Sequence, residues 1–255
     1  MISIITITYN NFEELKNTLD SIHEAENIES IVVNGGNDLQ TLEYLKSYSG
    51  KVINEEDSGI AEAFNKGLKI SSGEFIMFLN SGDVLLDSEY LTIAEDHLKK
   101  HSDLSFIHSN ILFYDNVAGE IFMRPQMKSL GRGQPYFHPT MVVRKSCFDK
   151  IGDFNTSYEI AMDFDFIVRM KKYSLKGKYI DGRTVVKMAG FGKSSEKEKE
   201  AIKECYKSLK ENDLLSINNC FGYLIRKILF ASRKLMELVG AKDSLSKLKR
   251  KKHSA

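Results

Sequence analysis

Four polar segments in the first third of the chain carry side chains that could bind a ligand. They lie at residues 8–11, 34–38, 54–58 and 80–83, and each follows a short apolar run. Their carboxylates, amides and hydroxyls can hydrogen-bond a polar molecule, and a carboxylate can hold a hard divalent cation. If the apolar runs are neighbouring strands of one parallel sheet, the four segments meet at its carboxyl edge, where open α/β sheets bind ligands. The sequence therefore predicts a ligand site at this edge.

Two further acidic side chains, Asp163 and Asp165, lie in a stretch with helical spacing of apolar residues. Residues two positions apart point to different sides of a helix, so we do not expect both carboxylates to serve one site. One of them can act as a general base towards a bound hydroxyl group, a role that contributes roughly 10² to 10⁴ in rate. Either can instead be a helix N-terminal residue that the macrodipole favours.

The elements that must position these residues alternate between strand and helix over the first 100 residues. β-Branched residues in 2–8 and the helical spacing of apolar residues in 12–23 predict a strand followed by a helix. The same alternation predicts strands at 30–33, 51–54 and 74–79 and helices at 41–48, 59–70 and 88–101. Repeated strand–helix–strand units indicate a parallel sheet with helices on both faces.

The second half of the chain departs from this alternation. We expect strands at 104–114, 120–123 and 178–189, helices at 146–151 and 161–173, and a loop at 131–139. A polar connection at 190–199 leads to helical sequence from residue 200 onwards. The sequence has no internal repeat.

The polar segments also carry motifs in a definite order. These are Thr8-Tyr9-Asn10, Asn34-Gly35-Gly36, Asp57-Ser58-Gly59-Ile60 with Asn65-Lys66-Gly67, and Phe78-Leu79-Asn80-Ser81-Gly82-Asp83. In this order and spacing they resemble the GT-A-fold family 2 glycosyltransferases, and most closely the bacterial members that build O-antigen, capsule and other exopolysaccharides. The resemblance covers roughly residues 1–189. Each motif alone is a weak signal, but the combination is fairly specific.

The resemblance implies an α/β fold of the GT-A class: a Rossmann-like, nucleotide-binding mixed sheet flanked by helices, with a C-terminal amphipathic helical extension. It divides the chain into a catalytic domain at 1–190 and a helical, basic extension at 191–255. Within the catalytic domain, residues 1–100 would bind the nucleotide sugar and residues 101–190 would bind the acceptor.

The implied activity is inverting transfer of a hexose or N-acetylhexosamine from a UDP-sugar, with Mn²⁺ or Mg²⁺ as cofactor. The acceptor would be a saccharide linked to polyprenyl diphosphate, in the assembly of O-antigen or another surface polysaccharide. The cation would neutralise charge on the leaving diphosphate, and such ions often take only one or two protein carboxylates plus the phosphates themselves.

Carried over position by position, the resemblance gives each motif residue a role. Asp163 would be the catalytic base and Asp83 the metal ligand, while Asp165 and Arg169 would be secondary residues of the site. The nucleotide sugar would be bound by Thr8, Tyr9, Asn34, Asp57, Asn65, Lys66, Ser81 and His138.

Two positions depart from the family pattern. Asn34 stands where the family usually has an Asp, so it loses the charge, keeps an acceptor and adds a donor. Ser81-Gly82-Asp83 supplies one carboxylate where the metal motif of the family has two. Structural roles are also open: Asp83 can cap a turn, His138 can be a surface or core histidine, and Arg169 can pair with a helix carboxylate.

Length and composition fit one large domain with an appendage, since the 255 residues are 42% hydrophobic and 28% charged. The formal net charge of +1 argues against a nucleic-acid partner. Cys147, Cys205 and Cys220 lie far apart and form neither a disulfide framework nor a metal motif. We expect no secretory leader and no transmembrane helix, and therefore a cytoplasmic protein.

Charge is distributed unevenly along the chain. From residue 222 to the end there are ten Lys or Arg and two Asp or Glu, about +8, so the remainder sums to about −7. Apolar residues between 221 and 239 fall on one helical stripe, and a basic run follows at 247–252. This pattern predicts an interfacial helix that holds the protein on the inner face of an anionic membrane, the alternative being a helix that packs on the catalytic domain. The basic residues expected on the other side of this helix are Arg226, Lys227, Arg233 and Lys234.

Other classes of protein share some of these features. A non-catalytic nucleotide-sugar or glycan-binding protein at the membrane is suggested by the reduced Ser81-Gly82-Asp83 motif, and it would bind its ligand without turnover. A nucleotidyltransferase normally has a Gly-rich, Arg- or Lys-bearing loop after the first strand, and Thr8-Tyr9-Asn10-Asn11 is not such a loop. The turn at Asn34-Gly35-Gly36 lacks the G-x-G-x-x-G spacing of dinucleotide-binding oxidoreductases.

Overall fold

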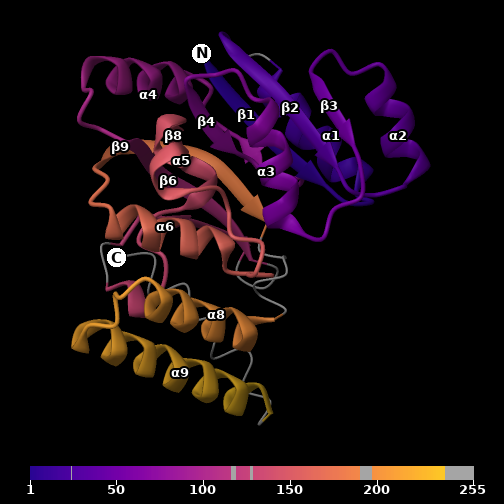
Figure 1. Cartoon of the computed structure of the whole chain (residues 1–255). Coiled ribbons are helices and arrows are strands. Elements are labelled where there is room, and N and C mark those ends of the chain that lie inside the picture. The colour runs from indigo at the N-terminus through magenta and orange to yellow at the C-terminus, as the bar shows by residue number, and fades with distance from the viewer. Residues whose placement is uncertain (24, 116–118, 127–128, 190–196, 239–255) are drawn as a thin grey trace.

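The computed structural model describes residues 1–23, 25–115, 119–126, 129–189 and 197–238. Within these ranges a nine-stranded sheet forms the centre of the molecule, and helices lie against both of its faces (Figure 1). The strand order is β3-β2-β1-β4-β8-β6-β9-β5, and β7 pairs with β6.

The first half follows the predicted alternation of strands and helices. β3, β2, β1 and β4 are parallel neighbours. β1 and β4 are buried along their whole length because helices cover both faces of the sheet, and their Ile and Phe side chains suit that environment. The elements are β1 (Ile2–Thr8), α1 (Phe12–Ile22), β2 (Ile28–Asn34), α2 (Leu39–Lys46), β3 (Lys51–Asn54), α3 (Ile60–Ile70) and β4 (Phe75–Phe78).

The second half adds antiparallel strands to the same sheet. β8 (Val142–Arg144) lies antiparallel between β4 and β6 (Phe106–Asp115), and β9 (Gly177–Ala189) runs parallel to β6. The edges are completed by β7 (Gly119–Met123) on β6 and by β5 (Val84–Leu85) on β9, both antiparallel. The mixed sheet confirms the expected fold class, whereas the two-residue strand β5 is absent from the sequence prediction.

Helices complete the molecule after β4. The segment expected to be a loop at 131–139 overlaps two short 3₁₀ helices, η1 (Leu130–Arg132) and η2 (His138–Thr140). The α-helices of this half are α4 (Glu89–Lys100), α5 (Ser146–Ile151), α6 (Met162–Lys172), α8 (Glu198–Glu211) and α9 (Ile217–Leu238).

Apolar side chains on the two faces of the sheet form two cores. Successive residues of a strand point to opposite faces, so Ile5 and Ile7 of β1 join the core beneath α3, α5 and α6, whereas Ile2 and Ile4 join the core beneath α1 and α4. The first core holds a cluster of aromatic rings in contact with one another. Its members are Phe64, Phe78, Phe148, Phe154 and Phe166.

The C-terminal helices pack on the second half of the domain. α8 contacts α6, and α9 contacts α8 and η1, so the two helices lie beyond α6 in Figure 1. Among the helices in the described part of the chain, none combines the length and the apolar composition that crossing a bilayer requires. Most of the expected connection at 190–199 and all of the basic run at 247–252 lie outside the described residues.

Candidate active site

The carboxyl ends of β1 and β2 form one continuous surface. Thr8 pairs with Asn34 across the two strands. Asn10 has a left-handed backbone, with φ 50°, which turns its side chain towards the loop after β2. There its Oδ1 accepts hydrogen bonds from the backbone N–H of Asn37 at 2.8 Å and of Asp38 at 2.9 Å.

Two glycines let neighbouring loops approach closely. A Cβ atom on Gly36 would lie 2.4 Å from Asn10 Oδ1, and one on Gly35 would lie 1.9 Å from Asp57 Oδ2. A larger residue therefore fits only if those side chains move. Asp57 also accepts a hydrogen bond from the N–H of Gly59 at 3.0 Å, immediately before α3. The loops after β1, β2 and β3 thus meet at one edge of the sheet.

Asn34 and Tyr9 occupy different places at this edge. Asn34 is 1% exposed, and its Nδ2 donates to the Gly36 carbonyl and to Asn54 Oδ1, both at 3.2 Å. Its Oδ1 accepts from the N–H of Gly36 at 3.0 Å. Asn34 therefore holds its own turn, and direct contact with a base stays a prediction. Tyr9 is 69% exposed, so its ring lies at the rim of the surface.

Asp83 lies buried in the polar segment after β4. Its Oδ2 accepts a hydrogen bond from the N–H of Asn80 at 3.2 Å, and the N–H of Ser81 donates to the Ile7 carbonyl of β1 at 3.0 Å. Burial raises the pKa of Asp83 to about 7, against the opposing effect of the Asn80 N–H, and the Glu14 carboxylate raises it further. A cation close to Asp83 would favour its charged form.

Oxygen atoms without hydrogen-bond partners lie in the same loops. Among the described residues, the buried Oγ1 of Thr8 and Oδ1 of Asn80 have none. Glu14 approaches from α1, since its Oε2 would lie 3.1 Å from a Cβ on Gly82. The described residues contain no group of three or more His, Cys, Asp or Glu able to hold a metal. A cation at Asp83 would therefore complete its oxygen shell from phosphates, as Mg²⁺ commonly does, and the donor set fits such an ion.

Asp163 is the second residue of α6 and is half-buried. Its Oδ1 accepts a hydrogen bond from the N–H of Phe164 at 2.6 Å. Burial lowers the pKa of His138 in η2, and the neighbouring Asp163 carboxylate opposes this effect. The His138 ring stacks on Phe78 of β4 with centroids 5.4 Å apart and an interplanar angle of 18°. Asp163 is thus close enough to His138 to act on it electrostatically, and the His138 ring lies against the end of β4, five residues before Asp83.

The segment before α6 is held by residues that are distant in sequence. Asn65 of α3 accepts from the N–H of Phe154 at 2.9 Å and donates to its carbonyl at 2.8 Å. Glu204 of α8 accepts from the backbone N–H groups of residues 159, 160 and 161 at 3.0, 2.9 and 2.8 Å. Because residue 161 is the N-cap of α6, these bonds fix the backbone from which Asp163 projects.

Asp165 contacts α8, and Arg169 contacts Asp165 and the end of α5. Arg169 Nε donates to Asp165 Oδ2 at 2.8 Å, and Ser208 Oγ donates to Asp165 Oδ1 at 2.7 Å. Asp165 is 2% exposed, so this ion pair is buried. Arg169 also donates to the Gly152 carbonyl at 2.9 Å. The geometry gives both residues a structural role in joining α6 to its neighbours.

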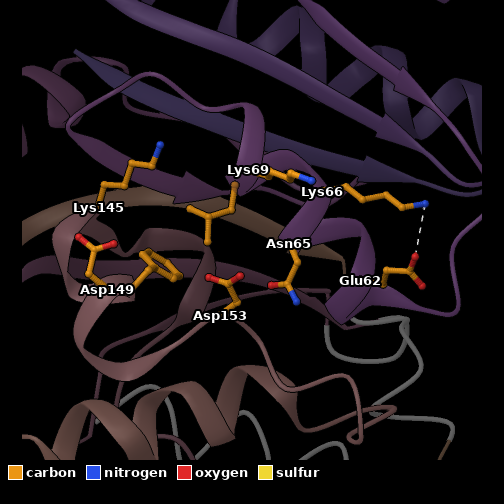
Figure 2. A pocket seen from close by; sticks show the side chains of 9 residues that line it. Glu62, Asn65, Lys66, Lys69, Lys145, Asp149 and Asp153 are labelled. Atoms are coloured by element: carbon orange, nitrogen blue, oxygen red, sulfur yellow. Dashed lines mark ion pairs between the residues drawn. The ribbon is translucent and has the colours of Figure 1, made fainter.

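Lys66 joins α3 to the loop after β3. Its Nζ donates to the Glu56 carbonyl at 2.5 Å and lies 3.5 Å from the Glu62 carboxylate. Figure 2 shows Lys66 and Asn65 beside a pocket of about 400 Å³, which also has side chains from α5. The residues that line this pocket include neither Asp83 nor Asp163, so the pocket is separate from the candidate active site.

Two residues of the site, Glu14 and Glu204, are absent from the sequence prediction, and Asn10 was included in the segment 8–11 without a role of its own. Glu14 follows the first strand closely, and its place beside the ligand edge could have drawn attention to it. Glu204 lies in a helix beyond the motif region, and a single glutamate there has no recognisable pattern.

The mixed sheet flanked by helices defines an α/β protein of the GT-A class. The family model described as "Glycosyl transferase family 2" matches residues 3–172, which include the strand-end loops and Asp163. The chain therefore belongs to glycosyl transferase family 2.

Curated relatives from mycobacteria are similar in sequence. "Uncharacterized glycosyltransferase MT1564" of Mycobacterium tuberculosis (strain CDC 1551 / Oshkosh) is 28% identical over 178 residues, which cover 66% of this chain and 68% of the relative. "PGL/p-HBAD biosynthesis glycosyltransferase" of Mycobacterium bovis (strain BCG / Pasteur 1173P2) is 24% identical over 179 residues, which cover 66% and 69%.

Solved structures share the fold at low sequence identity. S. aureus TarS 1-349 in complex with UDP-GlcNAc has a TM-score of 0.66 and 17% identity, and the match covers 88% of this chain and 71% of that one. The match to a longer TarS chain covers 43% of its length. Mannosyltransferase PcManGT from Pyrobaculum calidifontis, in complex with GDP-Man and Mn²⁺, has a TM-score of 0.63 and 14% identity, with 96% and 80% covered.

Proposed function

We propose that the chain transfers a hexose or N-acetylhexosamine from a UDP-sugar to a saccharide hydroxyl, with inversion at the anomeric carbon. One observation carries the proposal: Asp83 follows β4, whose Phe78 stacks on His138, and the charge of Asp163 on α6, in the other half of the domain, acts on that histidine. The similarity to structures that hold UDP-GlcNAc, or GDP-Man with Mn²⁺, supports a nucleotide-sugar donor and a divalent cation.

The donor would bind at the carboxyl edge of the parallel strands. Tyr9, which is exposed, would stack on the uracil ring, and Asp57, which lies against Gly35, would face the base or ribose. Asn34 would contribute by holding the turn after β2, through the hydrogen bond that it accepts from the N–H of Gly36. Ser81 lies beside this edge, and its Oγ is 3.5 Å from the Asn11 carbonyl.

Asp83 would hold the Mn²⁺ or Mg²⁺ ion, with Glu14 and the unpartnered oxygens of Thr8 and Asn80 in the surrounding loops. When bound, the ion would neutralise charge on the departing diphosphate. Because Asp83 is buried, ionising its carboxylate costs free energy unless a positive charge lies nearby. We therefore expect the cation and the donor phosphates to bind together.

Asp163 would act as the general base. Its carboxylate accepts the proton of the acceptor hydroxyl, the hydroxyl oxygen bonds to the anomeric carbon, and the bond from that carbon to the diphosphate oxygen breaks, releasing UDP. A single displacement of this kind inverts the anomeric centre. The hydrogen bonds that Glu204 accepts from the backbone before α6 would position Asp163 for this step.

We further propose that the acceptor is a saccharide linked to polyprenyl diphosphate, used in O-antigen or another surface polysaccharide. Residues 1–100 would then bind the donor, and residues 101–190 the acceptor. The chain would work peripherally on the inner face of the cell membrane. The motifs shared with surface-polysaccharide enzymes and the excess of basic residues at the C-terminus support this view.

UDP release from a panel of UDP-sugars tests the proposal, with Mn²⁺ and a lipid-linked GlcNAc-diphosphate acceptor. Asp163→Asn should lower acceptor-dependent release by roughly 10² or more, and chelation should abolish it. Asp149→Asn is the matched control, because Asp149 is an exposed carboxylate in the first turn of α5, and this variant should keep full activity. UDP binding without turnover on any acceptor would favour a non-catalytic nucleotide-sugar-binding protein. Failure to bind any nucleotide would refute the transferase proposal.

A further inference from the structure

Helix α9 turns a polar side towards the protein. Arg233 pairs with Glu198 of α8, and Arg226 lies near the Cys205 thiol of α8, where its charge opposes the rise that burial causes in the pKa of that thiol. Of the four basic residues expected on the side opposite the apolar stripe, Arg226 and Arg233 therefore lie towards the domain.

Close backbone contact with η1 fixes the orientation of α9. A Cβ on Gly222 would lie 2.6 Å from Ser129 Oγ, and one on Gly131 would lie 1.8 Å from the Asn219 carbonyl. Asn219 Oδ1 also accepts from the N–H of Gly131 at 3.2 Å. The two glycines therefore allow α9 to approach the domain on this side only, and the opposite side faces outwards.

The outward side of α9 carries large apolar residues. Their spacing of four, three, four and seven positions keeps them on one face of a helix. More than half of each side chain is exposed, from 52% at Leu224 to 90% at Ile217. We define the α9 stripe as Ile217, Phe221, Leu224, Ile228 and Leu235.

An apolar face of this length is unusual on a protein surface in water. Contiguous exposed apolar patches typically mark sites of interaction with another protein or with a membrane. Leu229 and Leu238, at 55% and 84% exposed, widen the same surface. The helix is thus amphipathic, but it uses its polar face for the intramolecular contact and leaves its apolar face available.

The positive charges beside the stripe favour a negatively charged partner. Lys227 and Lys234 are exposed and lie seven positions apart, on one edge of the stripe. Between Ile217 and Met236 the sequence has four basic residues and no acidic one. A second copy of the chain would bring like charges together, whereas anionic lipid head groups would be attracted, by about 1 kcal/mol per lysine near the surface.

We propose that the α9 stripe docks on an anionic lipid bilayer, with α9 parallel to the membrane plane and Lys227 and Lys234 at the head groups. Docking depends on the proposed function in one respect: it would bring the catalytic domain to an acceptor whose lipid part stays in the membrane. The contact of α9 with α8 and η1 would then fix the orientation of the catalytic domain relative to the bilayer.

Co-sedimentation of the full chain with vesicles tests this docking without any need for turnover. The wild type should bind vesicles that contain phosphatidylglycerol much more strongly than pure phosphatidylcholine vesicles. Leu224→Asp/Ile228→Asp should reduce binding at least about 100-fold, and Lys227→Glu/Lys234→Glu at least about tenfold. Leu39→Asp, on a leucine that is 80% exposed in α2, and Lys46→Glu/Lys100→Glu are the matched controls and should bind as the wild type does.

Hydrogen exchange provides a second readout that does not depend on variants. In the wild type, vesicles should slow amide exchange selectively at residues 217–238. As a separate control for folding, the stripe substitutions should leave UDP binding unchanged. Equal vesicle binding by all variants, or no binding by the wild type, would overturn the proposal. A dimer in light scattering that the stripe substitutions dissociate would show instead that a second copy covers the stripe. Loss of nucleotide binding in every protein would count against the proposed function and not against docking.

Discussion

Replacing Glu204 with glutamine tests whether α8 positions the candidate base. Oε2 of Glu204 accepts from the N–H groups of residues 160 and 161, and Oε1 accepts from that of residue 159. Glu204→Gln keeps the length of the side chain, but its NH₂ group cannot accept these bonds. Whichever way the amide turns, at least one backbone donor loses its partner, and the remaining bonds become neutral.

The expected size of the effect follows from these contacts. A hydrogen bond to a charged group contributes about 1.5–3 kcal/mol and a neutral one about 0.5–1.5 kcal/mol. Exchanging three charge-assisted bonds for one or two neutral bonds should lower the free energy of unfolding by at least about 1.5 kcal/mol. A shift of about 1 Å in the backbone that carries Asp163 can cost about 10² in rate. We therefore expect kcat to fall about 10- to 100-fold, with little change in the donor KM.

Urea unfolding and steady-state UDP release measure the two effects separately. Glu211→Gln is the matched control on the same helix, since its carboxylate accepts one bond, from the Tyr158 hydroxyl at 2.6 Å. It should lose about 1 kcal/mol and keep its kcat. If Glu204→Gln loses stability but retains the kcat of the wild type, α8 stabilises the fold without positioning the base, and the reasoning is refuted.

Three other substitutions test separate parts of the structure. Gly35→Ala places a Cβ 1.9 Å from Asp57 Oδ2, so calorimetry should show weaker UDP binding and denaturation a loss of about 1–3 kcal/mol; unchanged binding would contradict the role of this contact. Burial raises the pKa of Glu29, but bonds from one lysine and two serines outweigh it and lower the pKa to about 2. These bonds favour the ionised carboxylate, so the stabilisation is complete above pH 4.5 and is lost as pH falls towards 2. The difference in the free energy of unfolding between wild type and Glu29→Gln should therefore shrink over that range in urea unfolding; a constant difference would argue otherwise. Arg169→Met leaves the buried Asp165 carboxylate without its cation and should cost about 3–5 kcal/mol, with Asp165→Asn restoring part of it in the double variant; a loss below 1 kcal/mol would show that the pair is not essential.

Local signals were sufficient to predict the parallel half of the fold. Alternating strands and helices place the loops at residues 8–11, 34–38 and 54–58 on one edge, and the structure confirms that they meet there. This works because parallel strands joined by helices must end on the same side of the sheet. The i, i+4 spacing likewise offered an ion pair between Asp165 and Arg169, which the structure contains.

Contacts between distant segments were beyond reach of the sequence. The sequence did not predict that the buried Asn34 side chain would hydrogen-bond Asn54, because only the register of β2 and β3 brings the two residues together. The orientation of α9 was also not predictable, because amphipathic spacing shows that a helix has two faces but not which face the domain will contact. Here Arg233 has a carboxylate partner on α8, and that pairing turns the apolar face outwards.

The anchoring of the segment before α6 has a consequence for recombination among relatives. A crossover at residue 190 appears natural in sequence, since it separates the motif region from the C-terminal helices. Yet Glu204 from beyond that point binds three backbone groups before α6, and Asn65 of α3 binds the backbone of Phe154. A chimaera that exchanged the C-terminal helices alone would thus alter the support of Asp163. Functional exchange would require the 152–161 segment and α8 to be transferred together.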